Sequence, residues 1–420
     1  MVSVRRWGIA AAVVLLLGGC APGSSDPTAG REPTPGRLSY VYFTDGPDEQ
    51  VTRSLIAEYE KTRGVRVDLQ IVPFSELQQQ LQARLASGNA PDVARVHNLG
   101  AYRGELADLG PIGGEFLDQA QQAIRGPGGE TLAVPSDLTM NGPLVNTDQF
   151  ARAGVALPPP DRPWTWDELL ANARRVQQAV GAPHAIAFDK SGHRLAGLFS
   201  QFGTTYFGPG GGVAFDPVKA ERAVRLFVDL NQQGLMYKDF WIESGTKYRG
   251  ANEIFLRQDA PVYFSGNWQV SQLAKSAKFG WAAIPNPCAQ RCGGYPGGKF
   301  MIVFNQSPNQ RAAAEFVAFM NSRAAQERYA REAKFLPTRK DLIASGVSYP
   351  DHGADMAVFL GDVARTDPDA FADNYHPAFD TAARAAVKEF AAAIAGQQSA
   401  ADTVERIRAE AAEAAEASSR

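Results

Sequence analysis

The chain has 420 residues, of which 45% are hydrophobic and 21% are charged, and its formal net charge at pH 7 is -3. This composition is typical of a globular protein rather than a disordered or fibrous one. No block of lysine and arginine follows residue 19, which argues against nucleic acid as a partner. A chain of this length is too long for one compact core, so we expect two lobes.

The first twenty residues predict export. Arg5 and Arg6 precede an apolar run over 9–17, which is shorter than the ~20 residues that span a bilayer and predicts a signal peptide over 1–19. A chance apolar N-terminus is the alternative. The segment 17–20, Leu-Gly-Gly-Cys, resembles the lipobox of bacterial lipoproteins. That resemblance implies that Cys20 is the lipid-modified first mature residue, which anchors the protein on the extracytoplasmic face of the cell membrane. Residues 20–36 are small and proline-rich, so we expect a flexible tether there.

Alternating strands and helices follow the tether. The patterns predict strands over 38–43, 65–71 and 92–96, and helices over 47–63 and 75–88, the second opening with a capping box at Ser75 and Gln78. This order implies parallel strand pairing and an α/β lobe. Ligands of such sheets bind beyond the carboxyl ends of the strands, where Asp45 and Asn98 fall.

The middle of the chain, 144–275, is predicted to be mostly helical. A capping box is expected at Thr165 and Glu168, and Asp216 before Pro217 is expected to open another helix. Further strands are predicted over 279–284 and 300–304, a helix over 308–320, and one long helix rich in alanine, glutamate and arginine over 382–417.

Two cysteines follow Cys20, at positions 288 and 292. In an exported protein such a pair is normally oxidised, so we expect a Cys288–Cys292 disulfide that closes one tight loop. A zinc site would need two further ligands, and the five histidines show no paired spacing. We therefore expect neither a metal nor a cofactor.

Several segments resemble, in the same order, the motifs of extracellular solute-binding proteins of the maltose-binding-protein-like class that serve ABC importers. Residues 87–93 match its "SG-x-x-PDV" segment, 132–135 its "avP", 163–169 its "P-x-TWdEL" and 266–268 its Gly-x-Trp, with a late "GG" at 297–298 and "lP-x-R" over 336–339. Residues 144–146 depart from the pattern, because Leu-Val-Asn stands where the family has two aromatics before the asparagine.

The resemblance implies a fold and a role. The fold would be an α/β, two-lobe periplasmic-binding-protein fold of type II-like topology, each lobe a mostly parallel sheet flanked by helices, with the ligand cleft between them. Lobe 1 would comprise 37–140 and 282–338, and lobe 2 would comprise 141–281 and 339–420. A monomer would capture a carbohydrate, by hinged closure of the lobes, and deliver it to the permease subunits of an ABC transporter; we do not expect an enzyme.

A sugar-binding cleft needs planar polar side chains for hydroxyl groups and aromatic faces for C–H patches. The candidates, including the glycine of the late motif, are Asp45, Asn98, Asp137, Asn141, Trp241, Asn267, Trp268, Tyr295, Gly298 and Arg339. Each has a structural alternative. Trp268 could pack in the core, Trp241 could be a surface anchor, and the Asp and Asn residues could cap helices or close turns.

Two other functions stay open. The same fold could bind a phosphorylated or amino sugar, a glycerophosphodiester or a polyamine: Arg339 and Lys299 suit a phosphate, whereas Asp45 and Asp137 suit a cation. A surface glycoside hydrolase would need two carboxylates about 5 to 10 Å apart in a cleft, a separation that a linear sequence does not give.

Overall fold

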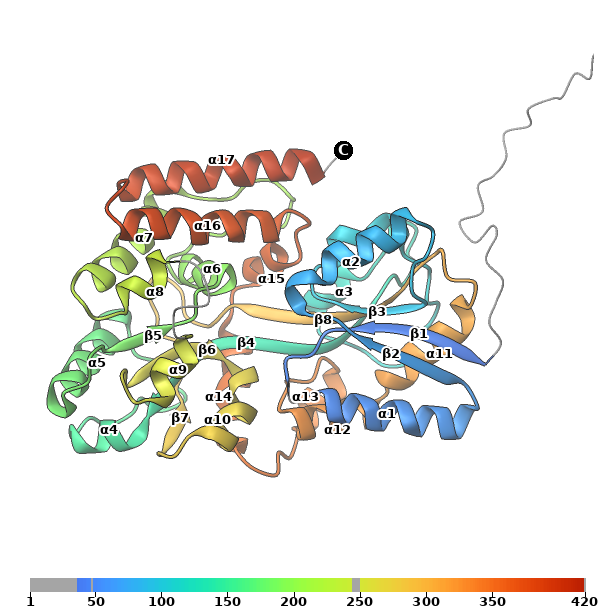
Figure 1. Cartoon of the computed structure of the whole chain (residues 1–420), viewed down its shortest axis with the longest axis horizontal. Helices are drawn as coiled ribbons and strands as arrows, with labels where there is room; N and C mark the ends of the chain where they lie inside the picture. Colours follow the sequence, from blue (N-terminus) through green and yellow to red (C-terminus); the bar gives the residue numbers. More distant parts are fainter. Residues whose placement is uncertain (1–35, 47, 244–249, 419–420) are drawn as a thin grey trace, which may run out of the picture.

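The computed structural model describes residues 36–46, 48–243 and 250–418. The predicted signal peptide, Cys20 and most of the predicted tether lie outside these ranges. Within them, no helix has the length and apolar character needed to cross a bilayer. Figure 1 shows two lobes side by side, joined by long strands that pass from one to the other.

Lobe 1 is the half built on the first three strands. β1 (Arg37–Tyr42), α1 (Asp48–Arg63), β2 (Arg66–Ile71), α2 (Phe74–Ala86) and β3 (Val93–Val96) follow one another, and β1 pairs in parallel with both β2 and β3. The predicted β-α-β-α-β order and its parallel pairing are thus confirmed. The capping box predicted at Ser75 is wrong: α2 begins at Phe74, after Pro73, and has no side-chain cap.

Two antiparallel strands, β4 and β8, connect the lobes. β4 (Val134–Asn146) pairs over its first half with β8 (Pro296–Val303), and β8 pairs with β3 of lobe 1. From Asn141 onward β4 pairs instead with β6 (Val262–Gly266) and β7 (Trp281–Ala283), and β5 (Ile186–Phe188) pairs in parallel with β6. One mixed sheet of order β2-β1-β3-β8-β4-β6-β5 therefore runs through both lobes, and β4 changes partners at Met140 and Asn141.

Lobe 2, built on β5, β6 and β7, is mainly helical around this sheet. The capping box at Thr165 and Glu168 is confirmed at the start of α5 (Trp166–Val180), and the Asp216 side chain caps α7 (Pro217–Gln232), as predicted. Its other helices up to β7 are α4 (Thr147–Arg152), α6 (Gly192–Gln201), α8 (Lys238–Ile242), α9 (Ala251–Leu256), η2 (Asn267–Gln269) and α10 (Val270–Ser276). The remaining helices of the first part of the chain, in lobe 1, are η1 (Gly100–Glu105) and α3 (Asp118–Ala123).

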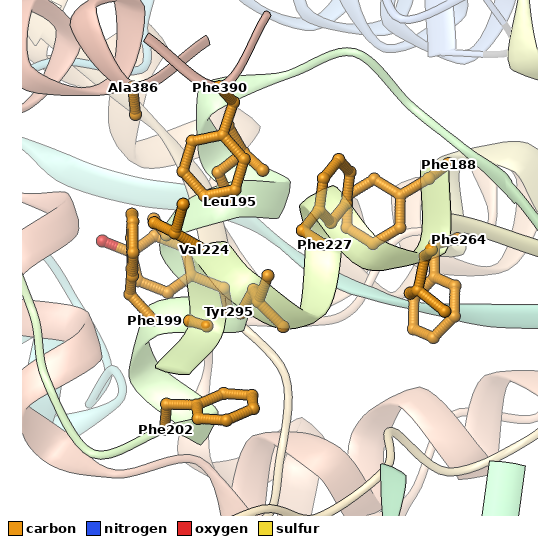
Figure 2. Close-up of a cluster of buried hydrophobic side chains, with 14 of the residues drawn as sticks. Phe188, Leu195, Phe199, Phe202, Val224, Phe227, Phe264, Tyr295, Ala386 and Phe390 are labelled. Carbon is orange, nitrogen blue, oxygen red and sulfur yellow. The ribbon is translucent and has the colours of Figure 1, made fainter. Parts of the chain in front are cut away.

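The C-terminal helix predicted over 382–417 is two helices, so the prediction of one long helix is wrong. α16 (Phe379–Ile394) and α17 (Ala400–Ser418) pack against each other, and the turn between them contains Gly396 with φ of 78°, a left-handed conformation that favours glycine. Figure 2 shows the face of α16 that points into the core: Phe390 and Ala386 lie in one aromatic-rich cluster with Leu195 of α6 and Val224 of α7.

The segments after β7 show where the chain returns between lobes. The backbone of Cys288 hydrogen-bonds to the start of α5, so 284–292 contacts lobe 2. The predicted Cys288–Cys292 disulfide is present in this segment. α11 (Gln310–Met320), α12 (Arg323–Ala333) and α13 (Lys340–Ser345) follow; α12 packs on α1 in lobe 1, and α13 packs on α12. α14 (Gly353–Arg365) packs on β4 and β7, and α15 (Pro368–Asn374) lies between the lobes (Figure 1). These contacts place 284–292 beside lobe 2 and α13 beside lobe 1, and the lobe boundaries at residues 282 and 339 stay predictions.

Candidate ligand-binding site

A cavity of about 210 Å3 opens where the lobes meet, far more space than the roughly 10–15 Å3 that one water requires. Its walls come from strand ends of lobe 1, from β4 and β8, and from helix starts of lobe 2. The lining residues are Phe43, Asp45, Phe74, His97, Asn98, Thr139, Asn141, Ser191, His193, Arg194, Trp268, Tyr295, Gly297, Gly298, Lys299, Asn374, Phe379 and Asp380.

The lobe 1 wall follows from strand topology. β1 and β3 are adjacent and parallel, so the residues after their carboxyl ends lie together, and these are Phe43 and Asp45 after β1 and His97 and Asn98 after β3. Phe74, at the start of α2, lies against this edge with its ring centroid 4.7 Å from that of His97. Its side chain is half-exposed, so it gives the rim an apolar ring.

The crossing strands supply the floor. Asn141 accepts a hydrogen bond at its side-chain oxygen from the backbone N–H of Tyr295, which fixes the two residues beside each other. The hydroxyl of Tyr295 donates to Asp373 at 2.7 Å. A Cβ at Gly297 of β8 would come within 2.5 Å of the hydroxyl oxygen of Thr139 of β4. A glycine at this position therefore avoids a clash between the two strands beside the cavity.

A network of buried charges lies behind the lobe 1 wall. Arg95, which is 1% exposed, donates to Asp137 at 2.8 Å and lies 3.4 Å from Asp48. Lys299 reaches Asp45 at 2.8 Å and Asp137 at 3.6 Å. Burial alone would raise the pKa of Asp45, but Lys299 and Arg95 outweigh it and hold that pKa below its usual value.

The lobes touch each other at the mouth of the cavity. His97 Nε2 lies 3.0 Å from Asp380 Oδ2, and the Asn98 side-chain amide donates to the same oxygen at 3.0 Å. Burial alone would raise the pKa of Asp380, but the hydrogen bond from His97, together with His193 and Asn98, holds it well below its usual value. Asp380 is in the first turn of α16, where a negative charge is also favoured by the helix dipole.

Trp268 is held between two groups of lobe 2. A Cβ at Gly266 would come within 2.1 Å of the indole ring, so the ring depends on the absence of a side chain there. The guanidinium of Arg194 lies over the indole, 4.1 Å from the ring centroid, and pairs with Asp189 at 3.3 Å. In this arrangement a cation covers one face of the tryptophan.

Two groups of lobe 2, His193 at the cavity wall and Asp373 behind it, have shifted pKa values. Burial lowers the pKa of His193 to about 4, and its Nε2 lies 3.1 Å from the Asn374 side-chain oxygen. Burial raises the pKa of Asp373 to about 7, although Tyr295 and the Phe207 backbone N–H hydrogen-bond to it. Both groups are therefore held toward their neutral forms.

The structure brings six of the ten candidates to the cavity: Asp45, Asn98, Asn141, Trp268, Tyr295 and Gly298. The other four lie elsewhere. Trp241 is 1% exposed in the lobe 2 core, between Phe188 and Phe227.

The remaining three have structural partners. Asp137 is buried beneath Lys299, where it pairs with Arg95. Asn267 is fully buried and joins β4 to the segment before α13, accepting from the Met140 N–H and donating to the Lys334 carbonyl. Arg339 pairs with Asp341 and donates to the Gly113 carbonyl of lobe 1.

Sequence reasoning missed most of the lobe 2 wall. Ser191, His193 and Arg194 directly follow β5, a three-residue strand that the predominantly helical prediction for 144–275 overlooked. The same rule that found Asp45 would have found them. Asn374, Phe379 and Asp380 come from helix ends that reach the cavity only through the packing of α15 and α16, and no local pattern marks them.

In the described part of the chain, no three His, Cys, Asp or Glu side chains are grouped as ligands for a metal ion. The cavity instead combines hydroxyl, amide, carboxylate and aromatic groups, which is the chemistry of a site for a small polar organic solute.

Comparisons with known proteins place this architecture. Residues 45–327 match the model of the bacterial extracellular solute-binding protein family. The chain belongs to this family. Its members are solute-binding proteins, and the structure has the two-lobe architecture of such binding proteins.

Individual relatives agree with the family. DasA of Streptomyces coelicolor, a diacetylchitobiose binding protein, is 23% identical over 353 residues, 79% of this chain and 81% of its own length. A lipoprotein of Streptomyces antibioticus is 29% identical over 180 residues, 40% of this chain and 38% of its own. The GacH receptor of Streptomyces glaucescens, solved unliganded and with acarbose, superposes with a TM-score of 0.75 at 20% identity, covering 90% of this chain and 98% of its own. That likeness shows the fold.

Proposed function

We propose that this protein captures a carbohydrate, a monosaccharide or short oligosaccharide, and delivers it to the permease of an ABC importer. The observation that carries the proposal is the mixed lining of the interlobe cavity: amide and hydroxyl groups of Asn98, Asn141 and Thr139 beside the rings of Trp268 and Phe74. Sugars present hydroxyl groups around apolar C–H faces, and this lining offers partners for both. The ligands named for DasA and GacH support the same class.

Binding requires a rearrangement at the tryptophan. Because Arg194 lies over Trp268, a sugar ring can stack on that face only after the guanidinium moves aside, while Asp189 remains available to hold it. The cavity draws on both lobes, so a ligand bound to one lobe gains the contacts of the other when the lobes close. Ligand then shifts the population toward the closed form by its differential affinity.

The N-terminal sequence supports lipid anchoring at Cys20, outside the described residues, and a relative called a lipoprotein agrees with it. A Cys20→Ala variant, expressed in a bacterial host, should move from the membrane fraction to the soluble extracytoplasmic fraction. A variant that stays membrane-bound would contradict the anchor.

The function is tested by a thermal-shift screen of sugars, with phosphodiesters and polyamines as comparison ligands. A true ligand stabilises the fold by mass action, by ~2.7 kcal/mol at a hundredfold excess over its dissociation constant. Ligand recovered unchanged after denaturation would exclude hydrolysis. Small-angle scattering with the ligand should give a smaller radius of gyration, and an unchanged radius would remove closure from the mechanism. Stabilisation only by a phosphodiester or a polyamine would overturn the carbohydrate proposal.

A further inference from the structure

The charges around the cavity do not balance. Behind the lobe 1 wall, Asp45, Asp48 and Asp137 share two cations, Arg95 and Lys299. All five groups are largely buried, so solvent screens them weakly. Three carboxylates against two cations leave this cluster one negative charge in excess.

The lobe 2 wall adds a second carboxylate, Asp380. Arg194 is balanced by Asp189, at 3.3 Å. No arginine or lysine of the described chain pairs with Asp380: its neighbours are the imidazole of His97, the amide of Asn98 and, further away, His193. Asp380 is therefore a second carboxylate on the cavity, and unlike Asp45 it has no arginine or lysine partner among the residues that the structure describes.

Both cavity carboxylates keep an oxygen for a ligand. Lys299 and Arg95 approach Oδ2 of Asp45, and His97 and Asn98 approach Oδ2 of Asp380; no described residue donates to either Oδ1. The Asp45 side chain is 25% exposed and that of Asp380 is 16% exposed, so a solute in the cavity can reach them. Their lowered pKa values keep both ionised at neutral pH.

An anionic ligand fits this site poorly. The cations that line the cavity, Lys299 and Arg194, already pair with carboxylates at 2.8 and 3.3 Å. A phosphate would have to compete for them in a region of net negative charge. A cation instead neutralises the excess, and the rings of Phe74 and Trp268 give it compatible π faces.

We propose that the solute carries a protonated amine, which Asp45 and Asp380 bind through their free oxygens, so that the natural cargo is an amine-bearing sugar. This inference rests on the proposed carbohydrate function and specifies the charge of the ligand. A charge-assisted hydrogen bond is roughly twice as strong as a neutral one, and two carboxylates line the same cavity, so we expect at least a tenfold preference for the amine.

The test compares sugars that differ at one substituent. Calorimetric affinities are measured for glucosamine, glucose, N-acetylglucosamine and glucose 6-phosphate, and for the β-1,4-linked dimers of the first three, with spermidine as a cation that is not a sugar. The titrations are run at about pH 6.5, where the amino groups of glucosamine, its dimer and spermidine carry a proton.

Each outcome bears on the amine inference, on the carbohydrate function, or on both. Amino sugars binding at least tenfold more tightly than their hydroxyl and acetamido counterparts would support the inference. Equal or tighter binding of a neutral or phosphorylated sugar would overturn it and leave the carbohydrate function standing. Spermidine binding without sugar binding would overturn the carbohydrate function, and no binding by any of them would overturn both.

Two variants assign the effect to the carboxylates. Asp380→Asn and Asp45→Asn should each reduce the amine preference to threefold or less, because each removes one cavity carboxylate while an amide can still bind hydroxyl groups. Asp229→Asn, at an exposed position on α7, is the matched control and should keep the tenfold preference. An unchanged preference in both cavity variants would place the amine elsewhere and overturn the assignment.

Discussion

Asp373 should make folding stability depend on pH in a way that one substitution can isolate. Its carboxylate lies in α15, where it accepts from the Tyr295 hydroxyl at 2.7 Å and from the Phe207 N–H at 2.8 Å, and no arginine or lysine of the described chain forms an ion pair with it. Burial raises its pKa from 3.8 to about 7. Full ionisation of the buried group therefore costs about 4 kcal/mol, at 1.36 kcal/mol per pKa unit.

The direction in which stability changes with pH follows from the linkage between protonation and folding. The unfolded chain loses this proton near pH 4, whereas the folded chain keeps it until about pH 7. The stability due to the protonated group is thus fully present below pH 4 and is lost as the pH rises to about 7. Asp373→Asn removes the titration and keeps a side-chain oxygen that accepts from the Phe207 N–H, while its amide N–H can donate to the Tyr295 hydroxyl oxygen. We expect the stability of the variant relative to wild type to increase by roughly 2.5 kcal/mol between pH 5 and pH 8.

The assay is urea unfolding at pH 5, 6, 7 and 8, followed by tryptophan fluorescence and circular dichroism, whose midpoints must coincide for a two-state comparison. The pKa of His193 is lowered to about 4, so the stability that neutral His193 contributes to the fold is lost as the pH falls below 6.5. His193 is present in both proteins, so this contribution cancels in the difference between them. Asp229→Asn, exposed on α7, controls for loss of a carboxylate as such. A difference between Asp373→Asn and wild type that is the same at pH 5 and pH 8 would refute the reasoning.

Three further substitutions test other parts of the structure. Arg95→Met should lower the free energy of unfolding by about 3–5 kcal/mol, because it removes the arginine that pairs with the buried Asp137 and Asp48. Arg311→Met, at a 95% exposed side chain, is the control and should have little effect. Equal effects of the two substitutions would contradict a stabilising role for the buried charge network. Gly266→Ala should displace the Trp268 ring and weaken binding of the sugar found in the screen by roughly three- to tenfold. Gly353→Ala, where a Cβ meets open space, is the control and should leave the affinity unchanged. Unchanged affinity in Gly266→Ala would remove Trp268 from the binding site. The Cys288→Ser, Cys292→Ser double variant should lose about 2 kcal/mol of stability for its short loop, as should the wild type with a reductant, and no loss in either would mean that the disulfide does not constrain the unfolded chain.

The local features of the fold could be predicted from the sequence. Alternation over 65–71, the capping box at Thr165 and the Asp216 cap were found correctly because each depends on residues within one or two turns of chain. The errors are also local: Pro73 starts α2 before the predicted cap, and Gly396 divides the C-terminal helix although alanines flank it on the N-terminal side. The collinear motifs pointed to the family because they lie in the order that the fold imposes.

The sequence by itself determined the α/β class, the family, through its collinear motifs, and the lobe 1 edge of the cavity. That edge follows because adjacent parallel strands bring Asp45 and Asn98 together wherever the chain continues. Only the tertiary structure decided the rest. Asp380 faces His97 because α16 docks beside the end of β3, although 282 residues separate Asn98 from Asp380. Asp137 and Trp241 are residue types that suit a ligand equally well, and packing alone buried them. The charge of the cavity is a sum over groups from both lobes, and no stretch of sequence contains that sum.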